Sequence, residues 1–182
     1  MKTALQIKGT EFERIVTARL QKYKAAGLAD IRRSGVQATM LPSGQWQVIP
    51  SRPDFEGVFQ GPLPVCFDCK VCSGASMDLS PYRDLTKGSR RLQLNYMFDK
   101  SRYGVNCFFL VHWNARVLQT KEEKAVTYAM PVDAQVPFWK EFIAGEVRAL
   151  RRGDCVEYGV QVPWTLFGEL DRSYQPDIRA VL

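Results

Sequence analysis

The segment from Ser51 to Lys70, SRPDFEGVFQGPLPVCFDCK, constrains the fold of this chain more than any other stretch. From residue 64 to 72 the sequence is apolar except at Asp68 and Lys70, which predicts a buried strand. Because side chains alternate between the two faces of a strand, Asp68 and Lys70 should emerge side by side on one face. Burying a carboxylate beside an ammonium group is costly, so we expect this pair to serve a purpose.

A second acid, Asp54, stands fourteen residues before Asp68 and directly follows Pro53. Residues 55–60 predict a strand, joined to the next strand by a turn at Gly61 and Pro62. Hard cations such as Mg²⁺ prefer oxygen ligands, so two carboxylates and the backbone carbonyl of Cys69 could hold one. A metal-bound water can then attack phosphorus, while Lys70 stabilises the developing charge or orients the water.

Three cysteines interleave with these charged residues, in the pattern Cys66-x-x-Cys69-x-x-Cys72. On a strand, Cys69 faces away from the other two, and those two lie about 20 Å apart at roughly 3.3 Å per residue. Three sulfurs so placed cannot bind one metal ion. A zinc or iron–sulfur site would require this segment to be a loop, and its valine and phenylalanine content favours a strand.

The N-terminal part predicts a helix over residues 9–26, because apolar residues recur there at helical spacing. Thr10 and Glu13 match a capping box, and Gly27 is a suitable end. Glu13 lies at the edge of the buried face, and the helix alone favours a capping role for it. A short strand over 30–34 and a hairpin over 39–49 follow.

The rest of the chain predicts two further helices and several strands. The expected elements are a helix within 82–100 that is firmest over 89–100, a central strand over 103–113 paired with 116–120, a charged turn at 122–124, a strand over 124–130 and a helix over 138–150. Together they indicate an α/β or α+β fold with a mixed sheet. At 182 residues the chain is most simply a single domain over 1–182, with a projecting hairpin at about 39–52 and a C-terminal extension from about 153.

Charge and composition favour an intracellular protein with an anionic partner. Lys and Arg outnumber Asp and Glu by 25 to 19, and the pI is near 9.1, a bias that suggests nucleic acid although many proteins are this basic without binding any. Arg32 and Arg33 stand beside Ser34 and a glycine, which suits phosphate contact or ordinary solvated charge. No run of about 18 apolar residues predicts a membrane span, and the five cysteines without a secretory signal indicate a reducing setting.

Two familiar kinds of catalytic site have little support. His112 is the single histidine, lies within an apolar strand and is better explained by packing than by general-base catalysis. Without a second histidine or an evident nucleophile beside it, a hydrolase triad is not indicated. The chain also lacks a Walker-type phosphate loop, so ATP use is not predicted.

At Ser51–Gly61 the sequence resembles the RecU Holliday junction resolvases, whose block reads S/T-x-x-D-aromatic-x-G-V-aromatic-x-G. The following F-D-C-K is similar to their F-E-A-K, with Asp68 in place of the usual glutamate. Glu13 on the first helix and Gln93 in R-L-Q-L-N fall where this family and related nucleases carry a glutamate and a glutamine. Residues 8–14 and 33–35 also resemble the archaeal Holliday junction resolvases, and both groups belong to the PD-(D/E)xK nuclease superfamily.

The resemblance covers about residues 9–145 and implies a restriction-endonuclease-like core, a mixed central sheet flanked by helices. It implies a homodimer that resolves four-way DNA junctions by paired nicking in recombination and repair, using Mg²⁺ or Mn²⁺, in the cytoplasm of a bacterium or in a bacteriophage setting. Glu13 then becomes a participant in the metal site and Gln93 a positioner of Lys70 or the water. The hairpin would enter the junction centre. The expected DNA contacts are Arg32, Arg33, Ser34, Lys87, Arg90 and Arg91.

Two other functions stay open at this stage. The same motif serves nucleases that cut flapped, nicked or linear duplex DNA, and only recognition of substrate shape separates them from junction resolvases. A non-catalytic junction-binding protein for recombination is the third possibility. The intact set of Asp54, Asp68 and Lys70 argues against it.

Overall fold

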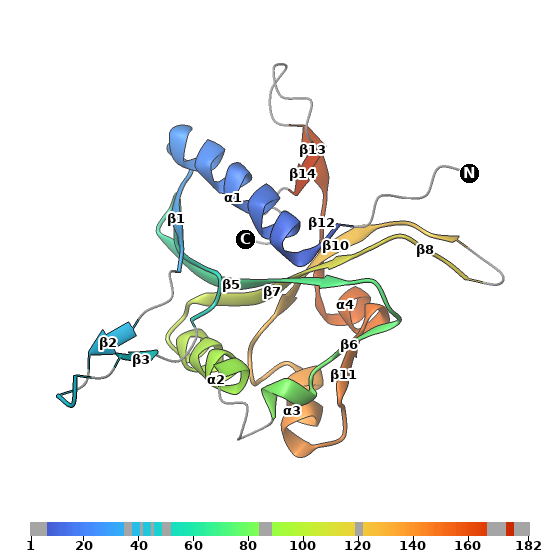
Figure 1. Cartoon of the computed structure of the whole chain (residues 1–182). Coiled ribbons are helices and arrows are strands. Elements are labelled where there is room, and N and C mark those ends of the chain that lie inside the picture. Colours follow the sequence, from blue (N-terminus) through green and yellow to red (C-terminus); the bar gives the residue numbers. More distant parts are fainter. Residues whose placement is uncertain are drawn as a thin grey trace.

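Strands β5 (Leu63–Cys72) and β7 (Asn106–Trp113) run parallel at the centre of a six-stranded sheet of order β1-β4-β5-β7-β10-β12. All other neighbours in the sheet pair antiparallel, so the sheet is mixed. Its other strands are β1 (Ala29–Arg33), β4 (Phe55–Phe59), β10 (Val126–Pro131) and β12 (Val160–Val162). The computed structural model in Figure 1 describes residues 7–34, 38–40, 42–44, 46–48, 52–83, 89–118, 122–166 and 174–176.

Helices cover both faces of this sheet (Figure 1). On one face, α1 (Gly9–Ala25) buries Phe12, Val16, Leu20 and Tyr23 in a cluster with sheet residues such as Phe67 and Leu110. The opposite face is covered by α2 (Ser89–Arg102), α3 (Pro137–Ala144) and α4 (Arg152–Tyr158), which share a second apolar cluster. The fold is therefore α/β with a mixed central sheet flanked by helices, as the sequence predicts.

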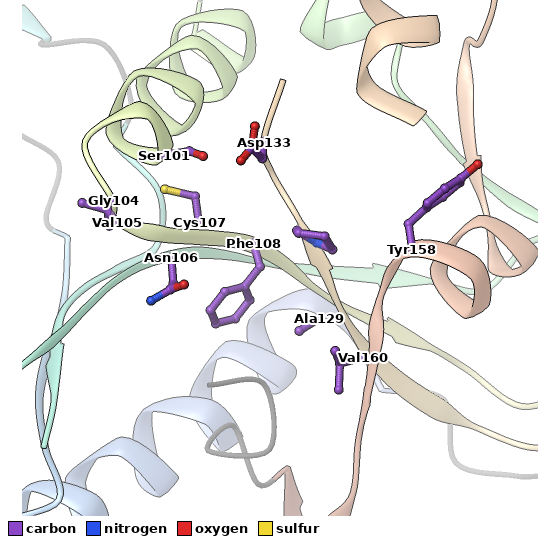
Figure 2. A pocket seen from close by; sticks show the side chains of 11 residues that line it. Ser101, Gly104, Val105, Asn106, Cys107, Phe108, Ala129, Asp133, Tyr158 and Val160 are labelled. Atoms are coloured by element: carbon purple, nitrogen blue, oxygen red, sulfur yellow. The ribbon is translucent and has the colours of Figure 1, made fainter. Parts of the chain in front are cut away.

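The alternation predicted for the apolar strand is present in β5. Cys66 and Cys72 belong to the cluster on the α2 face, whereas Phe67 and Cys69 belong to the cluster on the α1 face. The neighbouring β7 alternates in the same way: Figure 2 shows the Cys107 thiol and the Phe108 ring on opposite sides of the strand. Three cysteine sulfurs divided between two faces cannot meet at one metal ion, so the cluster interpretation is excluded.

The first helix agrees with the sequence in extent but not in the capping of its N-terminus. It runs over Gly9–Ala25. Gly27, just after its end, has a φ of 70°, the left-handed conformation in which a glycine commonly ends a helix. Its N-cap is Lys8, with no side-chain capping hydrogen bond. Thr10 lies one residue inside the helix, so the predicted capping box is wrong. Glu13 therefore does not cap the helix and can have another role.

The predicted hairpin after β1 is also present. Strands β2 (Ala38–Met40) and β3 (Trp46–Val48) pair antiparallel with each other and lie apart from the main sheet (Figure 1). Gly44, in the turn, adopts a φ of 77°. The predicted turn at Gly61 is likewise confirmed, with a φ of 98° between β4 and β5.

The pairing predicted for the central strand is wrong. β7 pairs with β5 and β10, whereas the next segment, β8 (Arg116–Val117), pairs with β9 (Glu122–Glu123). Residues 122–123 therefore form a strand where we expected a charged turn. Arg116 Nε donates to Glu123 Oε2 at 2.6 Å across this ribbon, so opposite charges on facing positions favour the pairing.

The third helix is shorter than predicted. It ends at Ala144 because Gly145 adopts a φ of 95° and donates its N–H to the carbonyl of Phe142. The chain then forms β11 (Ala149–Arg151), which pairs with β6 (Ser76–Asp78). Arg151 is the last residue of β11 and the N-cap of α4, so the end of the predicted helix is replaced by a strand.

The C-terminal part contributes to the sheet itself, since β12 pairs with β10 as the last strand. Beyond it, β13 (Trp164–Leu166) and β14 (Tyr174–Pro176) form a two-stranded ribbon. Within the ranges that the structure describes, no helix has both the length and the apolar character needed to cross a membrane.

Candidate active site

Asp68 is the buried centre of the site. Its side chain is fully enclosed in the sheet, on the face that α2 covers. Asp68 Oδ1 accepts hydrogen bonds from Gln93 Nε2 at 2.7 Å and from the backbone N–H of Asp54 at 3.2 Å. Asp54 in turn accepts the backbone N–H of Cys69 on Oδ2 at 2.8 Å. The two acids predicted from the sequence, one in β5 and one just before β4, are thus linked by hydrogen bonds from main-chain N–H groups to their carboxylates.

Lys70 forms an ion pair with Asp68 Oδ2, as its position two residues further along the strand predicts. Burial raises the pKa of Asp68 to about 7, although the Lys70 ammonium acts in the opposite direction. For Lys70 itself, burial would lower the pKa, but the Asp68 carboxylate and then Tyr82 outweigh burial and raise it. The site therefore holds a charged ammonium group in largely apolar surroundings.

Glu13 reaches the same site from α1. It forms an ion pair with Arg33 of β1, and its side chain is 22% exposed. Its pKa is raised first by burial and then by the charge of Asp54, while Arg33 and Lys70 act to lower it. Glu13 therefore lies within electrostatic range of Asp54 and Lys70, as expected for a member of the site rather than for a helix cap.

Gln93 of α2 holds Asp68 rather than Lys70. Besides its hydrogen bond to Asp68, its Nε2 donates to the backbone carbonyl of Arg52 at 3.2 Å. Gln93 is itself buried, so this amide joins α2 to the segment that precedes β4. The resemblance predicts that Gln93 positions Lys70 or the water, whereas its hydrogen bond in the structure is to Asp68.

The acids provide a donor set suited to a hard cation. Asp68 Oδ2 is buried and makes no hydrogen bond besides its ion pair with Lys70, and the charge of Asp54 raises the pKa of both Glu13 and Asp68. A divalent cation would relieve that repulsion, and carboxylate oxygens are what Mg²⁺ prefers. Among the described residues, however, no three His, Cys, Asp or Glu side chains form a group that could hold a metal ion as they stand.

The predicted DNA-contact residues lie in different surroundings. Arg32 pairs with Asp30 at 3.1 Å, and Arg33 pairs with Glu13. Ser34 donates its backbone N–H to the carbonyl of Asp54 at 2.8 Å, so it borders the site directly. On α2, Arg90 is exposed and Arg91 is half-buried, whereas Lys87 lies outside the described residues.

Tyr82 is the residue of this site that the sequence did not reveal. It lies in η1 (Ser80–Tyr82), a short 3₁₀ turn, with its ring centroid 5.8 Å from Lys70 Nζ. For residue 82 the sequence predicts only the weak beginning of the helix within 82–100, which is firmest over 89–100. This segment has no periodic pattern that could have signalled a buried residue.

His112 has the packing role that its sequence context favours. It is buried between Phe12 and Trp164, with Nδ1 2.9 Å from Thr127 Oγ1. Burial lowers the pKa of His112 to about 4, so the imidazole is neutral near pH 7.

A separate pocket of about 270 Å³ opens beside the N-terminal end of β7 (Figure 2). Its lining includes Cys107, Asp133 and Tyr158, and none of the predicted site residues. The pocket is therefore distinct from the Asp68 site.

The chain resembles solved structures but no protein-family model. No protein-family model matches the sequence, and no curated protein matches it. Among solved structures, the chain is similar to Hjc, a Holliday junction resolvase from the archaeal hyperthermophile Archaeoglobus fulgidus, with 14% sequence identity and a TM-score of 0.47 over 84% of this chain and 95% of that chain. A likeness at this level does not carry function from one protein to another, so function has to come from the residues of this chain.

Proposed function

We propose that this protein is a metal-dependent endonuclease that resolves four-way DNA junctions by paired, symmetric nicking. The observation that carries the proposal is the ion pair of the enclosed Asp68 with the half-buried Lys70 in β5, with Asp68 also held by Gln93 and by the Asp54 backbone. A buried ion pair is a poor source of stability, so a chemical role is the better explanation for it. The likeness of this segment to the RecU block suggests which chemistry that is.

Asp54, Asp68 and the backbone carbonyl of Cys69 would hold Mg²⁺ or Mn²⁺, with Glu13 taking part directly or through water. When bound, the metal supplies a water of lowered pKa and neutralises charge at phosphorus. Lys70 stabilises the negative charge that develops on the phosphate, in surroundings where an ammonium group acts more strongly than in water. Gln93 keeps Asp68 in place through its hydrogen bond to Oδ1.

Substrate binding would use the basic residues around the site. The proposed contacts to DNA phosphates are Arg32, Arg33, Ser34, Lys87, Arg90 and Arg91, and the hairpin of β2 and β3 would lie at the junction centre. Arg33 is the member of this set best placed to act, because it already pairs with Glu13 at the site. Paired nicking requires two such sites, which a homodimer provides.

The proposal is tested by incubating the protein with labelled four-way, flapped and linear DNAs, each with Mg²⁺ and with a chelator. Symmetric nicks confined to the four-way junction are expected, and only with the metal. Equal cutting of linear duplex would instead identify a nuclease of the same superfamily with another substrate. Binding without cleavage in Mg²⁺ and in Mn²⁺ would overturn the enzyme proposal in favour of a junction-binding recombination factor.

A Lys70→Ala variant provides the test at residue level. It should bind the junction as tightly as the wild type but cut it at least about 10²-fold more slowly, because the charge-stabilising group is lost. Lys140→Ala, on the exposed surface of α3, is the matched control and should cut normally. Full activity in Lys70→Ala would refute the assignment of Lys70.

A further inference from the structure

The ammonium group of Lys70 lies beside two aromatic rings that pack against each other. Its Nζ is 5.8 Å from the ring centroid of Tyr82 and 5.7 Å from that of Phe109, and these two rings pack against each other at 5.6 Å. A cation within about 6 Å of a ring face is attracted by the ring's negative face. Lys70 therefore has partners on its apolar side as well as its ion pair with Asp68.

Tyr82 and Lys70 also interact electrostatically. Tyr82 is 3% exposed; after Asp68 it raises the pKa of Lys70, and the Lys70 ammonium acts to lower the pKa of Tyr82, which burial raises. A buried tyrosine hydroxyl normally has a polar partner, and the ammonium group beside this ring is suited to that role. Lysine has three N–H donors on a flexible stem, so a second acceptor restricts the positions that the ammonium can occupy.

The backbone around Tyr82 is held firmly. On its N-terminal side, Leu79 is fully buried and donates its N–H to the carbonyl of Arg148 at 2.9 Å. On its C-terminal side, Arg83 donates to the carbonyl of Phe142 in the last turn of α3 and to that of Val147 beyond its end. Tyr82 is thus fixed from both sides against the layer formed by α3 and β11, which is the support that a positioning residue requires.

We propose that Tyr82 is a positioning residue for Lys70, holding the ammonium group where it supports cleavage of the phosphodiester. This inference deepens the proposed nuclease function and rests on it for the consequence in catalysis. The contact between the two side chains can be tested independently of any activity. Tyr82 acts through Lys70 and is not itself assigned a contact with the DNA.

The direct test follows the Lys70 side chain in solution by NMR of the ¹⁵Nζ-labelled protein, with its signal assigned through Lys70→Arg. The wild type should show a Lys70 ammonium signal whose protons exchange slowly with water. Tyr82→Phe keeps the ring but removes the hydroxyl acceptor, so the protons should exchange at least about tenfold faster or the signal should disappear. Tyr82→Leu removes the ring as well and should have the larger effect.

The catalytic test measures single-turnover cleavage of the four-way junction and junction affinity in the same variants. Tyr82→Phe should cleave about tenfold more slowly with an unchanged Kd, the loss expected for one hydrogen bond that positions a catalytic group. In the Lys70→Ala background the same substitution should have no further effect, because both changes act through one group. Tyr128→Phe is the matched control, since Tyr128 is buried in the same apolar cluster but lies on β10.

An unchanged Lys70 signal in Tyr82→Phe would overturn the inference, as would an equal change in Tyr128→Phe. Slower cleavage that persists in the Lys70→Ala background would also overturn it, because Tyr82 would then act by another route. If the wild type cuts no DNA while the NMR signal responds as expected, the proposed function fails and the contact between Tyr82 and Lys70 stands.

Discussion

Asp68 shows how much of the site depends on one side chain of a particular length. It stands where the resembling family carries a glutamate, yet it meets Gln93, the Asp54 N–H and Lys70 at once within a fully enclosed space. Because the aspartate already reaches all of these partners, another methylene group would displace at least one of them. In this chain the shorter acid is part of the local packing.

Asp68→Glu is therefore expected to damage the protein, although it restores the residue typical of the resembling family. The added methylene should destabilise the fold by about 1–3 kcal/mol, as overpacking of a core usually does, and should slow cleavage. Urea unfolding together with the junction assay checks both effects. Asp99→Glu, on the exposed side of α2, is the control and should change neither. Wild-type stability in Asp68→Glu would mean that the site is looser than its hydrogen bonds indicate.

At this scale, strand periodicity predicted the pairing of Asp68 with Lys70, since alternation is a local property of the chain. The partners that arrive from elsewhere were harder to foresee. Gln93 and Glu13 were assigned to the site by resemblance, but the hydrogen bond of Gln93 to Asp68 depends on how α2 packs on the sheet. Tyr82 was missed because it lies in a short turn, where no repeat in the sequence reports burial.

Among the elements, the contact between β1 and β4 has the tightest steric requirement. Gly57 of β4 pairs with Ile31 of β1, and a Cβ on Gly57 would lie 2.1 Å from the carbonyl oxygen of Asp30. Only a residue without a side chain fits there. The contact matters for function because β1 carries Arg33 and the start of β4 follows Asp54.

Gly57→Ala should therefore push β1 away from β4 and destabilise the protein by more than about 2 kcal/mol, the range of strongly overpacked sites. Gly153→Ala in α4 is the matched control, since nothing lies within 4 Å of a Cβ there. It should be neutral or slightly stabilising, because alanine favours helix. Chemical denaturation of both variants measures the difference, and equal stabilities would contradict the steric argument.

The elements best predicted were those whose signals are local, such as α1, the hairpin of β2 and β3, and the strand that became β7. Two errors came from turns that depend on backbone conformation or on pairing. Gly145 ended α3 early through its left-handed φ, and β9 formed where a charged segment resembled a turn. After Gly145 the chain forms β11, which pairs with β6, and β9 pairs with β8. The sequence near each segment does not reveal these partners.

Across the whole molecule, the site joins the layers on the two faces of the sheet. Glu13 comes from the helix on one face and Gln93 from a helix on the other, while Asp68 and Lys70 come from β5 between them and Asp54 directly precedes β4. The acids repel one another in the metal-free protein, because the charge of Asp54 raises the pKa of both Glu13 and Asp68. A bound cation should consequently stabilise the entire fold.

Thermal unfolding with Mg²⁺ and with a chelator at matched ionic strength tests this consequence without any DNA. At a free Mg²⁺ concentration tenfold above Kd, the folded state should gain about 1.4 kcal/mol, or roughly 3–6 °C in Tm. Asp54→Asn should lose most of this shift, whereas Asp133→Asn, beside the pocket at the start of β7, should keep it. An equal shift in both variants would mean that Mg²⁺ binds elsewhere.

The hydrogen bond from the Cys69 N–H to Asp54 has a practical consequence for protein engineering. Position 69 serves the site through its main chain alone, while its side chain packs on the opposite face of the sheet with the α1 cluster. Small apolar residues can therefore replace the thiol there and keep the donor, whereas proline would remove it. A surface cysteine introduced elsewhere could then be labelled with a thiol-specific probe, because the native thiol of Cys69 beside the acids would be absent.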